Sequence, residues 1–207
     1  MTSRNATALI ALVAIAFCSP ALADYSIVAG TTAPTYTDFS LNFDEPGGPT
    51  GVVPTDAWLV SHGITEFMAG DGVGQVGDFD PGWGLGDGNS FFGNFGVFIT
   101  WQDDLTELSV DVWDPSGPPT PFGGGLNFIL FNDGSEVGNL FVEPAWGGLG
   151  DQAFDVTTTG GDTFDEVRIL GFGFSPTTYV DNLTWNVPEP ASFALLALGG
   201  LALIRRR

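Results

Sequence analysis

The feature that most constrains the fold of this chain is a series of short apolar segments with a period of two, separated by turns. In Leu108–Val112 apolar and polar side chains alternate, which places the apolar ones on one face of a half-buried strand. Leu126–Phe131 is apolar on both faces, as in a strand at the centre of a sheet. No segment of residues 24–187 keeps a long helical period, so the pattern predicts an all-β body.

Turn residues join these segments into antiparallel pairs. Asn132-Asp133-Gly134-Ser135 predicts a hairpin whose second strand is Val137–Val142, and Ser175-Pro176 marks a turn between a last strand pair, Val167–Phe174 and Tyr179–Trp185. Further strands are expected at Tyr25–Ala29, Asp38–Asp44, Ala57–Val60, Ile64–Met68 and Phe91–Trp101. About ten short strands indicate an antiparallel β-sandwich with jelly-roll-like connections. The Gly- and Asp-rich stretch Ala69–Ser90 is expected to be a loop or lid of the same domain.

The charge of the body excludes several classes of function. Residues 24–187 hold 24 of the 25 acidic residues and one basic residue, Arg168, for a net charge of −23. Such a body cannot bind nucleic acid by neutralising phosphates, nor hold anionic lipid headgroups. One His, one Cys and no Lys remove most of the usual nucleophiles and general bases.

The N-terminal segment 1–23 is typical of a secretory signal peptide. Arg4 supplies the positive region, Ala6–Phe17 is apolar, and Pro20 precedes a small-x-small pattern formed by Ala21 and Ala23. We expect signal peptidase to cleave after Ala23. A retained anchor is the alternative, but the apolar run is short for spanning a bilayer. After cleavage the chain has no Cys.

The C-terminal segment 188–207 has three parts in a fixed order. Pro188, Glu189 and Pro190 form an extended segment, because the prolines prevent helix formation. The apolar run Ala191–Ile204 follows, about 21 Å long as a helix and therefore short for a bilayer core of about 30 Å. The chain ends with Arg205, Arg206 and Arg207, which would remain cytoplasmic. An ordinary tail anchor is the alternative, and an N-terminal signal peptide on the same chain disfavours it.

This tripartite end resembles the PEP-CTERM sorting signal of Gram-negative bacteria. The resemblance implies recognition by an exosortase, a membrane cysteine protease-transpeptidase thought to act at the Pro-Glu-Pro motif. The recognition residues would be Pro188, Glu189 and Pro190, with Arg205 to Arg207 as topological stop. The chain would be held transiently in the inner membrane by a short C-terminal transmembrane helix, and then reach the cell surface or extracellular matrix.

Two segments of the body resemble lectin-like jelly-roll domains that bind carbohydrate. Phe39–Gly48 matches their opening strand end, and Tyr179–Leu183 matches their closing strand. The resemblance implies a structural calcium ion held by an acid from each end. Asp44, Glu45 and Asp181 are the candidates for that site.

Asp and Asn side chains in the Gly-rich loop are further calcium candidates, because hard cations take oxygen ligands from flexible turns. These residues are Asp71, Asp78, Asp80, Asp87 and Asn89. The loop does not fit an EF-hand, and Asp and Gly are also ordinary turn formers. Any calcium would be structural; no other cofactor is expected.

Trp83 and Trp146 lie in Gly-rich loops and are candidates for stacking on sugar rings. Trp101, Trp113 and Trp185 lie at strand ends and are expected in the core.

A catalytic role would need a pair of carboxylates acting on a glycosidic bond. The raw material is Asp103, Asp104, Glu107, Glu136 and Glu143, and nothing distinguishes any pair among so many acids. His62 fits a turn better than a catalytic triad.

The sequence therefore predicts an exported, non-enzymatic protein with a structural or adhesive sandwich among extracellular polysaccharide. A calcium-dependent carbohydrate-binding module is the alternative, and a glycoside hydrolase ranks third.

Overall fold

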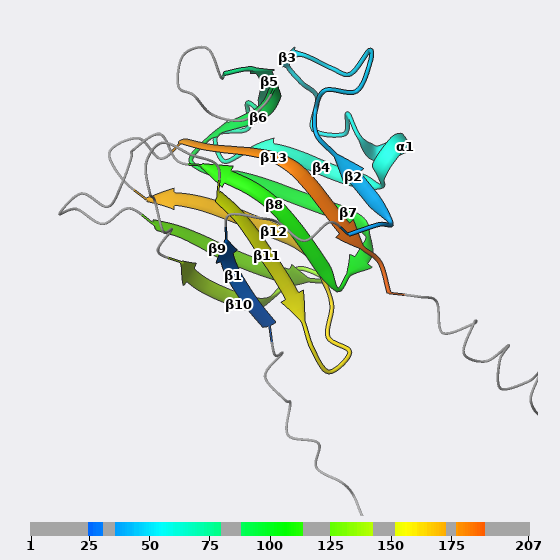
Figure 1. Cartoon of the computed structure of the whole chain (residues 1–207), viewed down its shortest axis with the longest axis vertical. Helices are drawn as coiled ribbons and strands as arrows, with labels where there is room; N and C mark the ends of the chain where they lie inside the picture. The colour runs from blue at the N-terminus through cyan, green and yellow to red at the C-terminus, as the bar shows by residue number, and fades with distance from the viewer. Residues whose placement is uncertain are drawn as a thin grey trace, which may run out of the picture.

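Two antiparallel sheets form the body (Figure 1). A computed structural model of the chain describes residues 25–30, 36–79, 88–113, 125–142, 152–172 and 177–188. The larger sheet contains, in spatial order, β1 (Tyr25–Gly30), β11 (Gln152–Thr158), β8 (Glu107–Trp113), β13 (Thr177–Asn186), β6 (Asn89–Asn94), β5 (Gln75–Asp78) and β3 (Gly51–Val52). The short strand β2 (Phe39–Leu41) pairs with β13 beside this path. The smaller sheet contains, in order, β10 (Ser135–Val142), β9 (Gly125–Asn132), β12 (Phe164–Phe172), β7 (Val97–Leu105) and β4 (Ile64–Ala69).

Alternate residues of both sheets meet in one hydrophobic core. Leu108 and Val110 of β8 are fully buried, and so are Ile99 of β7 and Val167 of β12 in the other sheet. Ser109, between Leu108 and Val110, lies on the other face of the sheet by the period of two but is also fully buried. The all-β fold and the antiparallel sandwich predicted from the sequence are therefore confirmed.

Aromatic rings fill the part of this core under β6. Phe67 and Phe91 have ring centroids 4.3 Å apart, and Phe43 and Trp58 pack edge-on at 5.4 Å. Phe43 reaches this cluster with φ +61°, a conformation that is uncommon for a bulky residue. The chain after β2 therefore holds a strained turn in place by burying an aromatic side chain.

The expected hairpin at Asn132-Asp133-Gly134-Ser135 is confirmed. Asn132 pairs with Ser135, and the two central residues have φ +49° and +72°. Two residues with positive φ form the turn that matches the twist of the flanking strands, and Asp-Gly suits it.

The expected last strand pair is wrong. β12 pairs with β7 and β9 in the smaller sheet, whereas β13 pairs with β8, β6 and β2 in the larger one. The connection between them therefore crosses from one sheet to the other instead of forming a hairpin. Such sheet-to-sheet connections are usual in a sandwich, and local sequence does not report them.

Three other expectations need correction. Ala57–Val60 is not a strand: it lies in turns and the start of a one-turn helix, α1 (Leu59–His62), which ends at Gly63 with φ +68°. The segment expected as one strand from Phe91 to Trp101 is divided into β6 and β7 by a turn at Phe95 and Gly96, both with positive φ. Finally, the expected loop Ala69–Ser90 contains β5, which pairs with β6.

Candidate functional site

The base of the C-terminal segment is tied to the body up to its last described residues. Asn186 ends β13, and its Nδ2 donates a hydrogen bond to Glu107 Oε2 at 2.6 Å. Its Oδ1 accepts from the backbone N–H groups of Thr37 at 3.2 Å and Asp38 at 3.4 Å. Asp38 Oδ2 in turn accepts from the backbone N–H of Val187 at 3.1 Å. We call Asp38, Glu107 and Asn186 the tail clamp.

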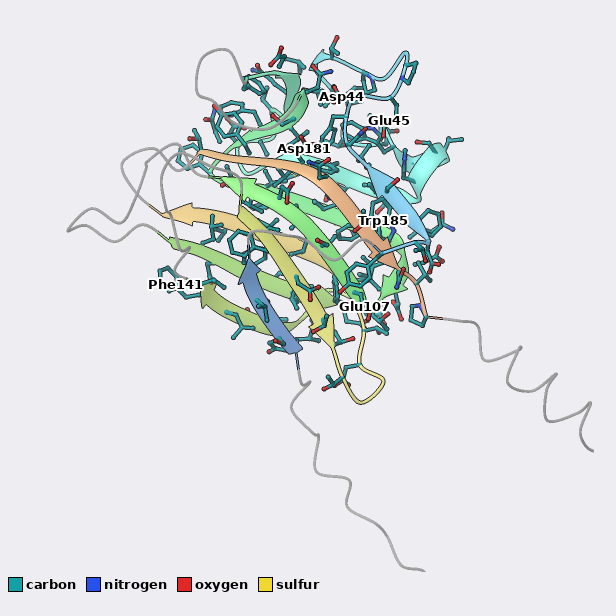
Figure 2. The ribbon with its side chains drawn as sticks, in the orientation of Figure 1. Asp44, Glu45, Glu107, Phe141, Asp181 and Trp185 are labelled. Atoms are coloured by element: carbon teal, nitrogen blue, oxygen red, sulfur yellow. The ribbon has the colours of Figure 1, made fainter. Side chains whose placement is uncertain are left out.

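The strand end behind the tail clamp is also locked into the core. Trp185 is 1% exposed; its ring stacks on Phe39 at 5.6 Å and meets Trp101 edge-on at 5.9 Å. The expected burial of Trp101 and Trp185 is therefore confirmed. Figure 2 shows Trp185 near the end of β13 and Glu107 at the start of β8, close to the point where the described chain finishes. Only Val187 and Pro188 follow the strand within the described residues.

A tyrosine covers the outer face of the larger sheet next to the tail clamp. The Tyr36 hydroxyl donates to Asp155 Oδ1 at 2.5 Å, and the Tyr36 backbone N–H donates to Thr184 Oγ1 at 3.1 Å. Burial raises the pKa of Tyr36 well above its ordinary value, and the hydrogen bond to Asp155 and the charges of Asp155 and Glu107 raise it further. The segment before β2 is thereby fastened across β11 and β13.

Asp44, a calcium candidate, holds the start of β6. Its Oδ1 accepts from both the backbone N–H and the side-chain Nδ2 of Asn89, each at 2.9 Å. A Cβ at Gly88 would lie 2.1 Å from Asp44 Oδ2, so only glycine leaves room for this carboxylate. Asp44 thus fixes the end of the Gly-rich segment to the turn after β2.

Asp181, the second calcium candidate, is fully buried on β13. It lies directly across from Asp111 of β8, and Asn182 donates from its backbone N–H to Asp181 and from its Nδ2 to Asp111. Two carboxylates at facing positions of an antiparallel pair repel one another. Asp44 and Glu45 lie in the turn after β2, and Asp181 lies on β13, the strand that pairs with β2 (Figure 2).

The other calcium candidates are spread out. Asp78 pairs with Asn89 at the exposed end of β5, and Asp71 accepts from Val73 N–H and Asn94 Nδ2, which lowers its pKa. Asp80 and Asp87 lie outside the described residues. Within the described ranges, no group of three or more acidic, His or Cys side chains is positioned to hold a metal ion.

Three of the carboxylates considered for catalysis accept hydrogen bonds from other side chains of the body. Asp104 accepts from Thr163, and Glu136 accepts from Asn139, while Glu107 belongs to the tail clamp. Asp103 is exposed on β7. His62 lies in α1 with its Nδ1 2.6 Å from Ser61 Oγ, which agrees with a turn role.

Several predicted site residues lie outside the described residues: Glu143, the candidate sugar-stacking residues Trp83 and Trp146, the cleavage-site residues Ala21 and Ala23, and Glu189, Pro190, Arg205, Arg206 and Arg207 of the sorting signal. Across the described ranges, no helix has the length and hydropathy needed to cross a membrane.

Comparison with known proteins identifies the end of the chain. Residues 186–207 match the PEP-CTERM protein-sorting motif. The sequence prediction for this segment is confirmed: the chain is an antiparallel β-sandwich that ends in a PEP-CTERM sorting motif. No curated protein matches the chain.

Among solved structures, the chain is similar to a carbohydrate-binding module of Clostridium stercorarium solved in complex with cellobiose. The identity is 11%, and the match covers 60% of this chain and 88% of that one, with a TM-score of 0.35. So low a score carries no argument about fold or ligand.

Sequence reasoning missed Tyr36 and Asn186. Their partners are more than 70 residues away in the chain, so no local pattern could reveal them. The one available signal was their position in the chain. Tyr36 lies just before the segment Phe39–Gly48, and Asn186 lies just after the segment Tyr179–Leu183.

Proposed function

We propose that this protein is exported, recognised by an exosortase at Pro188, Glu189 and Pro190, and then placed as a non-enzymatic structural or adhesive element among extracellular polysaccharide. Signal peptidase would remove residues 1–23. The C-terminal segment would hold the chain transiently in the inner membrane.

The observation that carries this proposal is the junction between the fold and the motif. The match to the sorting motif begins at residue 186, where β13 ends, and the tail clamp fixes the chain up to Val187. The Pro-Glu-Pro segment therefore directly follows the folded body. An enzyme acting there would separate the whole sandwich from the tail without cutting into a strand.

The charge of the body supports the polysaccharide setting. Its one cation, Arg168, is paired with Glu166 at 2.5 Å and lies against the rings of Phe98 and Phe131. An acidic surface of this kind repels anionic polymers and is compatible with neutral ones. Association with polysaccharide would then use hydrogen bonds, or divalent cations as bridges.

Sorting is tested by replacing both prolines of the motif with alanine, Pro188→Ala with Pro190→Ala, in a Gram-negative host that carries an exosortase. We expect protein that retains its C-terminal segment to accumulate in the inner membrane. The matched control replaces two exposed prolines of the body, Pro46 and Pro54, and should leave release normal. Normal release of the motif variant would contradict the proposal.

Calcium-dependent carbohydrate binding is the second candidate function. The observation that favours it is the fully buried Asp181 facing Asp111, because a divalent cation would relieve the repulsion between the two carboxylates. Main-chain and amide oxygens would have to complete its coordination. We expect calcium to raise the melting temperature and EDTA to lower it, with the response lost in Asp181→Asn and kept in the exposed control Asp103→Asn. A melting temperature that does not respond to either reagent would remove this candidate.

A further inference from the structure

A polar depression of about 470 Å³ opens beside β13, and neither the sorting motif nor the calcium candidate accounts for it. Its polar lining comes from the strands β2 and β13 and the turn after β2. The five polar residues are Ser40, Asn42, Glu45, Asn182 and Thr184. The buried residues Leu41 and Leu183 also line it.

The depression exists because β13 changes partner. Thr177–Val180 pair with β6, and Leu183–Trp185 pair with β2, so neither strand continues the ladder at Asp181 and Asn182. On its other edge, β13 shows a register shift against β8 between Asp181 and Thr184. The break in pairing on one edge of β13 and the bulge on its other edge leave polar groups of this strand beside an open space. Bulges are common next to binding and active sites, where they redirect side chains.

Two residues near the depression have positive φ. Asn182 has φ +47° and Phe43, which follows Asn42, has φ +61°. Asn adopts this conformation readily, whereas a bulky residue such as Phe adopts it only at a conformational cost. The burial of Phe43 in the aromatic core keeps the turn in this shape, so Asn42 and Glu45 are presented by a rigid support.

The local hydrogen bonds also fix the turn. Asn42 Oδ1 accepts from the backbone N–H of Asp44 at 3.2 Å, and Glu45 Oε1 accepts from the backbone N–H of Asn42 at 3.4 Å. Across the depression, the Nδ2 of Asn182 is held by Asp111. Both walls are therefore positioned before any ligand arrives, which reduces the entropy lost on binding.

The chemistry of the lining selects the ligand class. Hydroxyl and amide groups donate and accept hydrogen bonds, which suits the hydroxyls of a sugar. Glu45 is the single charged group of the lining, and no cation is among these residues, so an anionic ligand is disfavoured. A volume of 470 Å³ is in the range of small-molecule sites and much larger than a coordination shell with oxygens at about 2.4 Å from a cation.

We propose that the depression between β2 and the bulge of β13 binds a neutral sugar unit of a polysaccharide through Ser40, Asn42, Glu45, Asn182 and Thr184. This inference deepens the polysaccharide part of the proposed function and is independent of sorting.

The test is binding of neutral oligosaccharides to the full-length chain, purified in dodecylphosphocholine because many other detergents carry sugars. Cellotetraose, maltotetraose and mannotetraose are titrated to about 10 mM by calorimetry, which detects a Kd of about 1 mM. An alginate tetrasaccharide is the anionic counterpart. We expect at least one neutral tetrasaccharide to bind, and the alginate not to bind.

Ser40→Tyr should fill part of the depression and weaken binding at least about tenfold. Ser26→Tyr, the same change at an exposed serine of β1 in the same sheet, should leave the affinity unchanged. Glu45→Gln, which keeps the shape and removes the charge, should weaken binding by a smaller factor because a carboxylate is the stronger acceptor.

Absence of binding by all three neutral tetrasaccharides overturns the proposal, as does tighter binding of alginate. Equal affinities of wild type, Ser40→Tyr and Glu45→Gln would show that sugar binds elsewhere. None of these results depends on processing, so failure of this proposal and failure of sorting are separate outcomes.

Discussion

The tail clamp makes a quantitative prediction for Asn186→Ala. The substitution removes a 2.6 Å hydrogen bond to the half-buried carboxylate of Glu107, and a bond to a charged group contributes about 1.5–3 kcal/mol. It also removes two longer bonds, from the backbone N–H groups of the exposed residues Thr37 and Asp38, where water can substitute at a cost below about 0.5 kcal/mol each. We therefore expect a loss of about 2–3 kcal/mol in the free energy of unfolding.

Urea unfolding followed by tryptophan fluorescence measures this loss. With an m-value of about 2 kcal/mol/M, the midpoint should fall by about 1 M. Asn139→Ala is the matched control, because Asn139 is an exposed strand residue whose side chain donates one 3.2 Å bond to the exposed Glu136. Its cost should be below about 1 kcal/mol. Equal midpoints for the two variants would refute the idea that the tail clamp stabilises the end of β13.

Two further predictions concern pH. Tyr36→Phe should lower the free energy of unfolding by about 1–2 kcal/mol near neutral pH, because it removes the hydrogen bond to Asp155. The difference between wild type and variant should narrow above pH 10. At that pH the unfolded wild type releases the Tyr36 proton, whereas the raised pKa keeps the proton bound in the folded state. Urea titrations between pH 8 and 12 test this, and a constant difference would contradict the assignment. Asp165→Asn should raise stability slightly at pH 7, because burial raises the pKa of Asp165 and its charged form is disfavoured in the fold. The gain should vanish below about pH 4, where both states bind the proton; a gain that persists at pH 3 would argue for a different cause.

The sequence predicts those parts of the fold in which local chemistry decides. The hairpin after β9 follows from Asp133-Gly134, since its turn needs two residues with positive φ. Strand β5 was missed because in Gln75–Asp78 only Val76 is apolar, which is too little to show a period. The strand predicted at Ala57–Val60 is wrong because a short apolar run does not by itself specify a strand: Trp58 is buried, whereas Leu59 and Val60 are exposed in α1.

Long-range pairing was not predictable from local pattern. The division of the sheets, with β12 and β13 on opposite layers, depends on which surfaces pack best after collapse. The same holds for the site. The sorting segment is a contiguous motif and was found, whereas the depression arises from the exchange of β6 for β2 along β13, which joins Ser40 to Thr184 across 144 residues.

The most direct test of the account is the mass of the C-terminal tryptic peptide of the released protein. Between residues 24 and 187 the chain has no Lys and one Arg, so trypsin cleaves the unfolded body only after Arg168. The account predicts a peptide that begins at Ile169, ends within the Pro-Glu-Pro segment and lacks the apolar run, together with an N-terminal peptide that begins at Asp24. Recovery from the cell surface or medium of a peptide that continues from Ile169 through Ala191–Ile204 to the terminal arginines would contradict it.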